Sequence, residues 1–147
     1  MILFCDTSAL VKLYVEEEFS ALVRAQAQEA RALAVSRIAW AQIMAALARR
    51  VREEPVDAQA VEAVRTRLRA DWPALAVVEV SQTLVELAGD YADTFALRGY
   101  DSVQLASART LQQAAGDTFC FACFDTRLNN AARVLGMQVL QPRGGRS

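Results

Sequence analysis

Short apolar segments alternate along this chain with longer segments of helical periodicity, and this alternation limits the available folds more than any other feature. Five segments have the length and the apolar or β-branched character of buried strands: residues 2–5, 33–36, 75–80, 118–124 and 137–140. Strands that are separated by helices predict a mainly parallel sheet, because each crossover between parallel strands needs a long connection. Helices then cover both faces, so the sequence predicts a three-layer α/β/α sandwich around this sheet.

Several helix boundaries are also readable. One apolar stripe at helical spacing consists of Trp40, Met44, Leu47 and Val51. Pro55 is expected to end that helix, because proline lacks the backbone N–H that a helix interior needs. Ser81 is a good N-cap for a later helix, and after a break at Gly99 either Asp101 or Ser102 is expected to begin the next one.

The composition suits one globular domain and excludes several chemistries. The chain has 147 residues, 54% of them hydrophobic, which is enough for a single domain with a real core. Its 16 basic and 17 acidic residues nearly cancel, so any nucleic-acid site must be local. The absence of histidine excludes a Ser-His-Asp triad, ribonuclease chemistry based on paired histidines and most zinc sites.

The sequence favours a cytoplasmic protein. It shows no signal-peptide pattern, and no apolar run approaches the ~20 residues of a bilayer-spanning helix. Its three cysteines, an odd number, favour a reducing compartment over a disulfide framework. Cys120 and Cys123 have C-x-x-C spacing, but residues three apart in a strand point to opposite faces. We therefore expect two buried free thiols rather than a redox pair or half of a zinc site.

Three aspartates stand where predicted strands end or helices begin. Asp6 follows the first strand, Asp125 follows the fourth, and Asp101 follows the break at Gly99. Ligands of open parallel sheets bind beyond the carboxyl ends of the strands, where three carboxylates could hold Mg²⁺ or Mn²⁺. Taken singly, each aspartate is explained by helix capping alone. Taken together, two apolar strands that each run into an aspartate favour a site.

Three motifs resemble those of a known family. They are FCDTSALVKLY at residues 4–14, LRGYDSVQLA at residues 97–106 and FDTRL at residues 124–128. In this order and spacing they are similar to PIN-domain ribonucleases, in particular to the VapC toxins of type II toxin–antitoxin systems. The resemblance covers residues 1–141, with residues 142–147 expected to form a flexible C-terminal tail.

The resemblance implies a five-stranded parallel sheet and a cluster of acidic residues that binds Mg²⁺ or Mn²⁺. It implies a metal-dependent endoribonuclease that cleaves structured RNA, such as tRNA or a ribosomal RNA loop. It also implies a VapB-like antitoxin as partner and a homodimer. A metal at Asp6, Asp101 and Asp125 would lower the pKa of a bound water, so this chemistry needs no histidine.

One position departs from the family pattern. VapC proteins carry a glutamate in the helix after the second strand as a further member of the acidic cluster, and this chain has Gln42 there. No other acid precedes Glu53 in that helix. We therefore expect Asp6, Gln42, Asp101 and Asp125 to form the catalytic set of a weakened or inactivated nuclease. The alternative places Gln42 on the solvated face of its helix.

Further residues are candidates for supporting roles. Thr7 and Ser8 are placed to orient Asp6 or to bind a water at the metal, although both are also ordinary capping residues. Arg98 is a candidate contact to RNA phosphates near the mouth of the site, although an ordinary surface charge explains it equally well.

Two other functions compete with the toxin ribonuclease. An aspartyl-phosphate enzyme would use Asp6 as acceptor, but it calls for an aspartate at position 8, which is Ser8, or for a lysine near a later strand. The only lysine of the chain is Lys12. A nuclease-dead PIN module that acts as a binding or autoregulatory partner is the stronger competitor, because of Gln42.

Overall fold

The sheet has the predicted architecture. The computed structural model describes residues 1–140, so the tail predicted for residues 142–147 lies outside the described residues. Five parallel strands pair in the order β3-β2-β1-β4-β5. Their bounds are β1 Ile2–Cys5, β2 Ala32–Ser36, β3 Ala76–Val78, β4 Phe119–Ala122 and β5 Gln138–Val139. Each of the predicted strands is confirmed, with ends that differ by a few residues.

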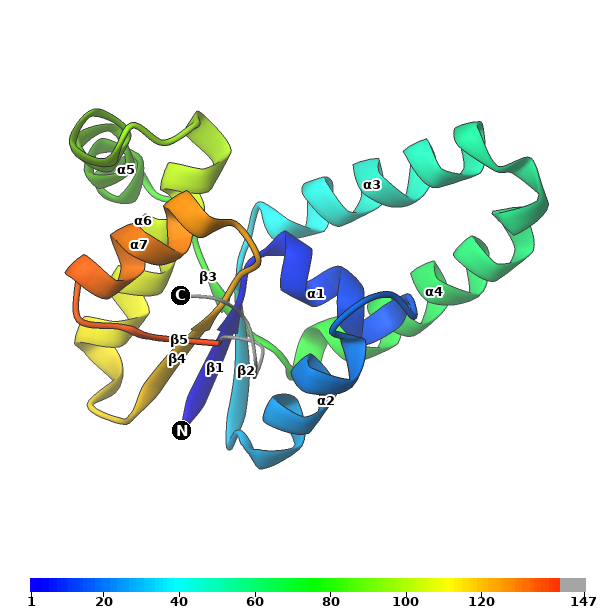
Figure 1. The fold of residues 1–147 in the computed structure, drawn as a ribbon, viewed down its shortest axis with the longest axis horizontal. Helices are drawn as coiled ribbons and strands as arrows, with labels where there is room; N and C mark the ends of the chain where they lie inside the picture. Colours follow the sequence, from blue (N-terminus) through cyan, green and yellow to red (C-terminus); the bar gives the residue numbers. More distant parts are fainter. Residues whose placement is uncertain (141–147) are drawn as a thin grey trace.

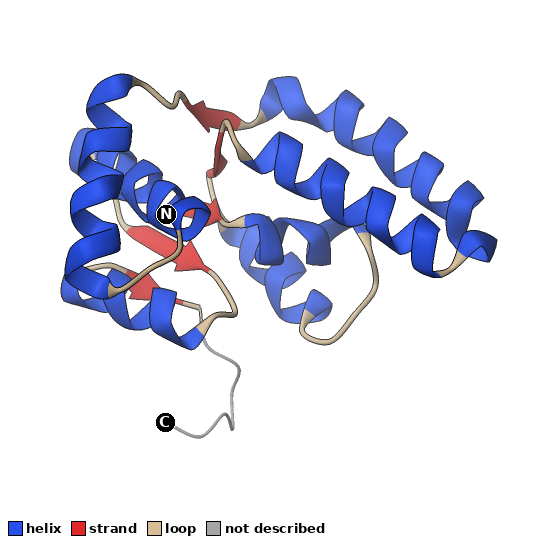
Figure 2. Ribbon diagram, turned by 90° about the horizontal axis from the view of Figure 1, so that it is seen from above, coloured by secondary structure: helices blue, strands red, loops and turns tan. Residues whose placement is uncertain are grey.

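Helices cover both faces of this sheet, so the three-layer prediction is also confirmed. They are α1 Thr7–Tyr14, α2 Ser20–Glu29, α3 Ala39–Glu53, α4 Ala58–Asp71, α5 Gln82–Phe95, α6 Gly99–Ala115 and α7 Thr126–Val134. Figure 1 shows α1 to α4 on one side of the strands and α5 to α7 on the other. Figure 2 shows that α3 and α4 run side by side and extend well away from the sheet.

The core consists of two layers that the central strand separates. Leu3 and Cys5 of β1 point toward the layer formed with α1 to α4. Phe4, one residue between them, points to the opposite layer formed with α6 and α7. This alternation is the two-residue period of a strand, and β1 is buried along its whole length because it lies between β2 and β4.

The C-x-x-C spacing follows the same rule. Cys120 packs in the first core layer and Cys123 in the second. Both are buried free thiols, and so is Cys5, which confirms the predicted absence of a disulfide. Among residues 1–140, no helix combines the length and the apolar character that crossing a membrane requires.

The helix boundaries correct one prediction. Ser81 caps α5 by accepting from the Leu84 N–H, and α3 ends before Pro55, both as expected. However, α6 begins at Gly99, so Asp101 lies in its first turn and does not cap it. The chain breaks earlier than predicted, at Ala96, which takes the left-handed conformation with φ 54° at the end of α5.

The helix α2 has no counterpart among the predicted boundaries. Its N-cap residue, Phe19, lies in the left-handed region with φ 68° and provides no side-chain cap. Its apolar stripe is weak, with only Ser20 and Val23 buried. The apolar pattern was therefore too weak to predict this helix.

Candidate active site

A cavity of about 260 Å³ opens at the carboxyl ends of β1, β2 and β4. Polar residues from four segments of the chain meet there. The residues that line it are Asp6, Thr7, Ser8, Gln42, Asp101, Gln104, Phe124 and Asp125. All four residues predicted for the catalytic set therefore face one cavity, together with Thr7 and Ser8.

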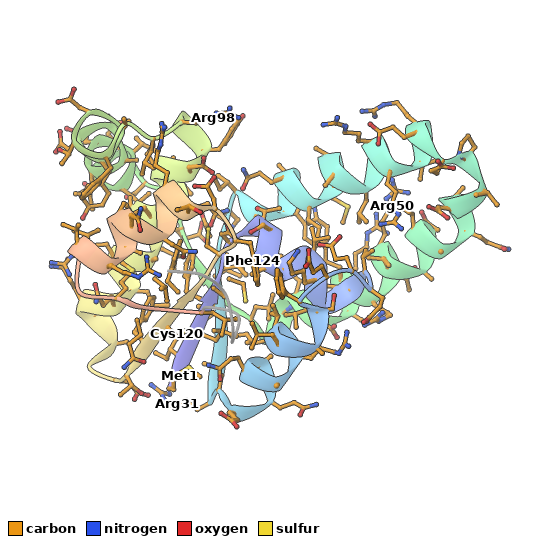
Figure 3. All side chains as sticks on the ribbon, in the orientation of Figure 1. Met1, Arg31, Arg50, Arg98, Cys120 and Phe124 are labelled. Carbon is orange, nitrogen blue, oxygen red and sulfur yellow. The ribbon has the colours of Figure 1, made fainter. Side chains whose placement is uncertain are left out.

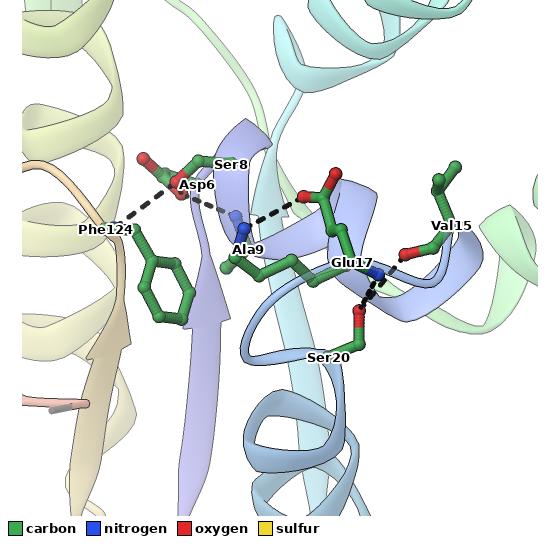
Figure 4. A network of polar contacts seen from close by, with 8 residues as sticks. Asp6, Ser8, Ala9, Val15, Glu17, Ser20 and Phe124 are labelled. Atoms are coloured by element: carbon green, nitrogen blue, oxygen red, sulfur yellow. Dashed lines mark hydrogen bonds and ion pairs between the residues drawn. The ribbon is translucent and has the colours of Figure 1, made fainter. Parts of the chain in front are cut away.

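Asp6 is the most firmly held of the aspartates. It is only 6% exposed and caps α1, with Oδ1 accepting from the Ala9 N–H at 3.0 Å. The Ser8 hydroxyl donates to the same oxygen at 2.7 Å and accepts from the Phe124 N–H at 3.3 Å. Figure 4 shows this chain of contacts, which ties the end of β1 to the end of β4. Ser8 therefore orients Asp6, as the sequence suggested.

Asp125 holds the equivalent position at the end of β4. It caps α7, with Oδ1 accepting from the Leu128 N–H at 2.8 Å. Its backbone N–H donates to the Cys123 Sγ at 3.3 Å, which secures the turn between strand and helix. Only one of its two carboxylate oxygens accepts the capping hydrogen bond, so capping explains the role of that oxygen and not of the other.

Asp101 serves no comparable structural purpose. It lies in the first turn of α6, and its side chain makes no hydrogen bond or ion pair within residues 1–140. Helix capping, the alternative explanation for all three aspartates, does not apply here. A partly buried carboxylate without a structural partner in a shared cavity is a candidate for ligand binding.

Burial and neighbouring negative charge raise the proton affinity of Asp6 and Asp101. Burial is the main reason that the pKa of Asp6 is raised; the hydrogen bonds from Ser8 and Ala9 oppose this rise, and the charge of Asp101 adds to it. The pKa of Asp101 is also raised, first by burial and then by the charge of Asp125. Like charges held close together favour a bound cation.

Gln42 lies in the cavity and not on the solvated face of α3. Its Oε1 accepts from the Thr7 hydroxyl at 2.7 Å and from the Gln104 Nε2 at 2.8 Å. Gln104 also donates to the Thr7 Oγ1 at 3.2 Å, so the three side chains form a closed triangle. Thr7 therefore positions residue 42 and does not orient Asp6.

The donor set is chemically suited to Mg²⁺ or Mn²⁺, although the side chains do not surround a single point. Carboxylate and amide oxygens are the ligands that these cations prefer. Within the described residues, none of the three aspartates is neutralised by an ion pair with lysine or arginine. Nevertheless, residues 1–140 contain no group of three or more His, Cys, Asp or Glu side chains arranged to hold a metal ion. The cavity therefore suits a cation by its charge and ligand chemistry, while the side chains as they stand do not converge on one ion.

Arg98 does not line this cavity but lies close to Asp101. Its charge lowers the pKa of Asp101, against the larger effect of burial. Figure 3 shows its side chain at the outer edge of the molecule, beyond the carboxyl ends of the strands. It lines a neighbouring cavity that shares a wall with the carboxylates.

The family model of the PIN domain matches residues 3–134 of this chain. The chain belongs to the PIN-domain family. Ribonuclease VapC45 of Mycobacterium tuberculosis (strain CDC 1551 / Oshkosh) is 34% identical over 139 residues, which is 94% of each chain. Ribonuclease VapC46 of Mycobacterium tuberculosis (strain ATCC 25618 / H37Rv) is 30% identical over 140 residues, 95% of this chain and 97% of that one. The chain is therefore a PIN domain of the VapC type.

Solved structures share the fold at much lower sequence identity. VapBC2 from Rickettsia felis, bound to a DNA fragment from its promoter, matches with a TM-score of 0.64 at 11% identity, over 95% of this chain and 97% of that chain. FitAcB from Neisseria gonorrhoeae matches with a TM-score of 0.62 at 15% identity, over 96% and 97%. These two matches support the PIN-domain fold of this chain.

Sequence reasoning missed two residues of this PIN domain's cavity, Gln104 and Phe124. Gln104 is 2% exposed, and its Oε1 has no hydrogen-bond partner within residues 1–140. The sequence carried no clear signal for it, because the burial of this amide one turn after Asp101 is visible only in the packed structure. Phe124 also lines the cavity. The Phe19 ring stacks on it with the two ring centres 5.5 Å apart, and the Lys12 ammonium lies 4.7 Å from the centre of the Phe124 ring. These contacts explain its position by packing.

Proposed function

We propose that this chain is a metal-dependent endoribonuclease, the toxin of a VapBC-type toxin–antitoxin system, which cleaves structured RNA such as tRNA or a ribosomal RNA loop. The observation that carries the proposal is the cavity in which Asp6, Asp101, Asp125 and Gln42 face one another. The ribonuclease names of its relatives support the reaction class.

The three aspartates would hold Mg²⁺ or Mn²⁺. When bound, such an ion supplies a water of lowered pKa near neutral pH and offsets negative charge on the phosphate. Asp6 is fixed by Ser8 and the start of α1, so it provides the rigid ligand. Asp101 makes no hydrogen bond or ion pair within residues 1–140, so its side chain is able to turn toward the ion. The absence of histidine is no obstacle, because none of these roles needs an imidazole.

Asp101→Asn provides the direct test, because it removes a charge without removing a structural contact. RNA cleavage by the wild-type chain is expected to need Mg²⁺ or Mn²⁺ and to stop with EDTA. Asp101→Asn is expected to lower cleavage at least 10-fold, since even indirect changes at metal sites typically cost ~10–100-fold. Asp93→Asn, at an exposed site on α5, is the matched control. Cleavage that resists EDTA and Asp101→Asn would refute the metal mechanism.

A nuclease-dead PIN module is the second candidate, and Gln42 is the observation that favours it. A neutral amide at this position attracts a divalent cation less than a carboxylate does. In this case the chain would retain RNA or partner binding without cleavage. Wild-type chain that binds Mg²⁺ in calorimetry but cleaves no RNA would support this second function.

The partners follow from the same family. We expect a VapB-like antitoxin and a homodimer. A chain of the solved toxin–antitoxin complex from Klebsiella pneumoniae shares the fold of this chain with a TM-score of 0.59, which supports an antitoxin as partner. We assign the chain to the cytoplasm, which its three free thiols support. Co-expression with the open reading frame upstream, followed by size-exclusion chromatography, tests the partner and the dimer together.

A further inference from the structure

A second cavity lies directly beside the carboxylate cavity, and two arginines line it. It measures about 590 Å³ and shares Asp101, Phe124 and Asp125 with the carboxylate cavity. Arg98 and Arg127 are the charged residues that it adds. A volume of this size lies in the range of ordinary ligand pockets, ≈300–1,000 Å³. Together the two adjacent cavities form a trough: aspartates line both of its parts, and the arginines line only the second part.

The two arginines form no ion pair within the described residues, although the charge of Arg98 acts on Asp101 and lowers its pKa. Other surface arginines do form one, as when Arg24 pairs with Glu16 at 2.6 Å. Arg127 donates from Nη1 to the Ala96 carbonyl oxygen at 3.0 Å, which holds the guanidinium against the wall of the cavity. A carbonyl does not neutralise the positive charge, and a guanidinium has further N–H groups to donate. Both side chains are therefore available to an anion.

The helix starts at this wall strengthen the positive potential. Arg98 is the N-cap residue of α6 and makes no side-chain cap, and Arg127 lies in the first turn of α7. These positions usually carry acids or hydroxyls, because the N-terminus of a helix has a partial positive charge. Arginine at both positions adds to that charge instead of offsetting it. Backbone N–H groups and arginine side chains together make a phosphate site.

We infer that this second cavity binds the RNA phosphate that neighbours the scissile one, with Arg98 and Arg127 as its ligands. The inference rests on the proposed nuclease function, because the carboxylates of the shared wall then mark the position of the scissile phosphate. The trough separates the two tasks. The carboxylate cavity carries the chemistry, and the part that the arginines line holds the strand in register without reading the base sequence.

Binding is measured in EDTA, so that cleavage does not interfere. Fluorescence anisotropy with a fluorescein-labelled single-stranded RNA oligonucleotide gives the Kd at several salt concentrations. Arg98→Gln and Arg127→Gln are each expected to weaken binding about tenfold, the loss of one charge-assisted contact. Each is also expected to reduce the slope of log K against log salt by ~0.7, the value for one phosphate contact on a single strand. A lysine at either position should restore most of the slope.

Arg133→Gln is the matched control, because this exposed arginine belongs to α7 but does not line the cavity. It should leave both the Kd and the slope unchanged, and thermal melts should show that all variants fold. Arginine variants that bind RNA like the wild-type chain would overturn the subsite. RNA binding that depends on Arg98 and Arg127 would support the phosphate subsite even if the wild-type chain cleaves no RNA. A lack of cleavage would refute only the proposed nuclease activity.

Discussion

Two hydrogen-bond donors converge on one oxygen of Gln42. The Thr7 hydroxyl and the Gln104 amide both donate to Oε1, at 2.7 and 2.8 Å. Such a pair of donors suits a carboxylate oxygen better than an amide oxygen, because hydrogen bonds to a charged acceptor are stronger. The surroundings of residue 42 are therefore compatible with the glutamate that the family pattern has there.

Gln42→Glu is expected to increase metal binding and RNA cleavage at least 10-fold, since even indirect changes at metal sites cost ~10–100-fold. The fold should not change, because the two side chains have nearly equal volume and similar helix propensity. Calorimetry with Mg²⁺ and a cleavage assay measure the two effects. Gln59→Glu adds the same charge on an exposed part of α4 and should have no effect. Equal metal affinity and cleavage in Gln42→Glu and wild type would exclude residue 42 from the site.

Gln104 is expected to act through residue 42. Gln104→Leu removes the donor at 2.8 Å from Gln42, and one hydrogen bond of this kind contributes ~0.5–1.5 kcal/mol. In the Gln42→Glu background, this change should lower cleavage about 3–10-fold by the same measure. A double-mutant cycle over positions 42 and 104 tests the coupling, because residues in contact give non-additive effects. Fully additive effects would show that Gln104 only packs in the core.

The sequence predicts some residues of the site better than others. Asp6 and Asp125 were predictable, because each directly follows an apolar strand in a parallel sheet. Gln104 and Arg127 were not, since each lies inside a helical segment where only the packed structure shows which neighbour it meets. The same limit applied to Thr7, whose partner lies 35 residues away along the chain.

At the scale of the elements, strand ends and helix starts coincide at the site. The strand β4 ends at Ala122 and α7 begins at Thr126, and Asp125 in the short turn between them caps the helix. Sequence patterns located the strands well because β1 and β4 are buried on both faces. They placed the start of α6 wrongly because Gly99 resembles a break, whereas the real break at Ala96 is an alanine in the left-handed region.

The two duties of Asp125 can be separated by substitution. Asp125→Asn keeps an oxygen that can accept from the Leu128 N–H, so stability in EDTA should be nearly unchanged while cleavage falls. Asp125→Ala removes the cap as well and should cost an additional ~0.5–2 kcal/mol of unfolding free energy. Urea denaturation and a cleavage assay on both variants distinguish the two effects. Equal stability losses in the Asn and Ala variants would contradict the capping role.

At the scale of the whole molecule, the acidic cluster lowers the stability of the metal-free chain. Burial raises the pKa of Asp6 above its ordinary value, with the charge of Asp101 adding to the rise. A carboxyl whose pKa is higher in the folded state binds its proton more tightly there. Folding is therefore penalised as pH rises through the folded pKa, and the penalty disappears below the pKa of the unfolded chain, about 3.9 for aspartate.

Asp6→Asn is consequently expected to melt at a higher temperature than the wild-type chain at pH 7 in EDTA. The Asn oxygen can still accept from the Ser8 hydroxyl and the Ala9 N–H, so the local structure is kept. The advantage should shrink as pH falls and vanish near pH 3.5, where both side chains are neutral. Added Mg²⁺ should raise the melting temperature of the wild-type chain and not that of Asp6→Asn, because a ligand that binds only the folded state stabilises it. Melting curves of the two proteins over this pH range, with and without Mg²⁺, make the measurement. A wild-type chain that remains the more stable at pH 7 in EDTA would show that the buried carboxylate is satisfied without a cation.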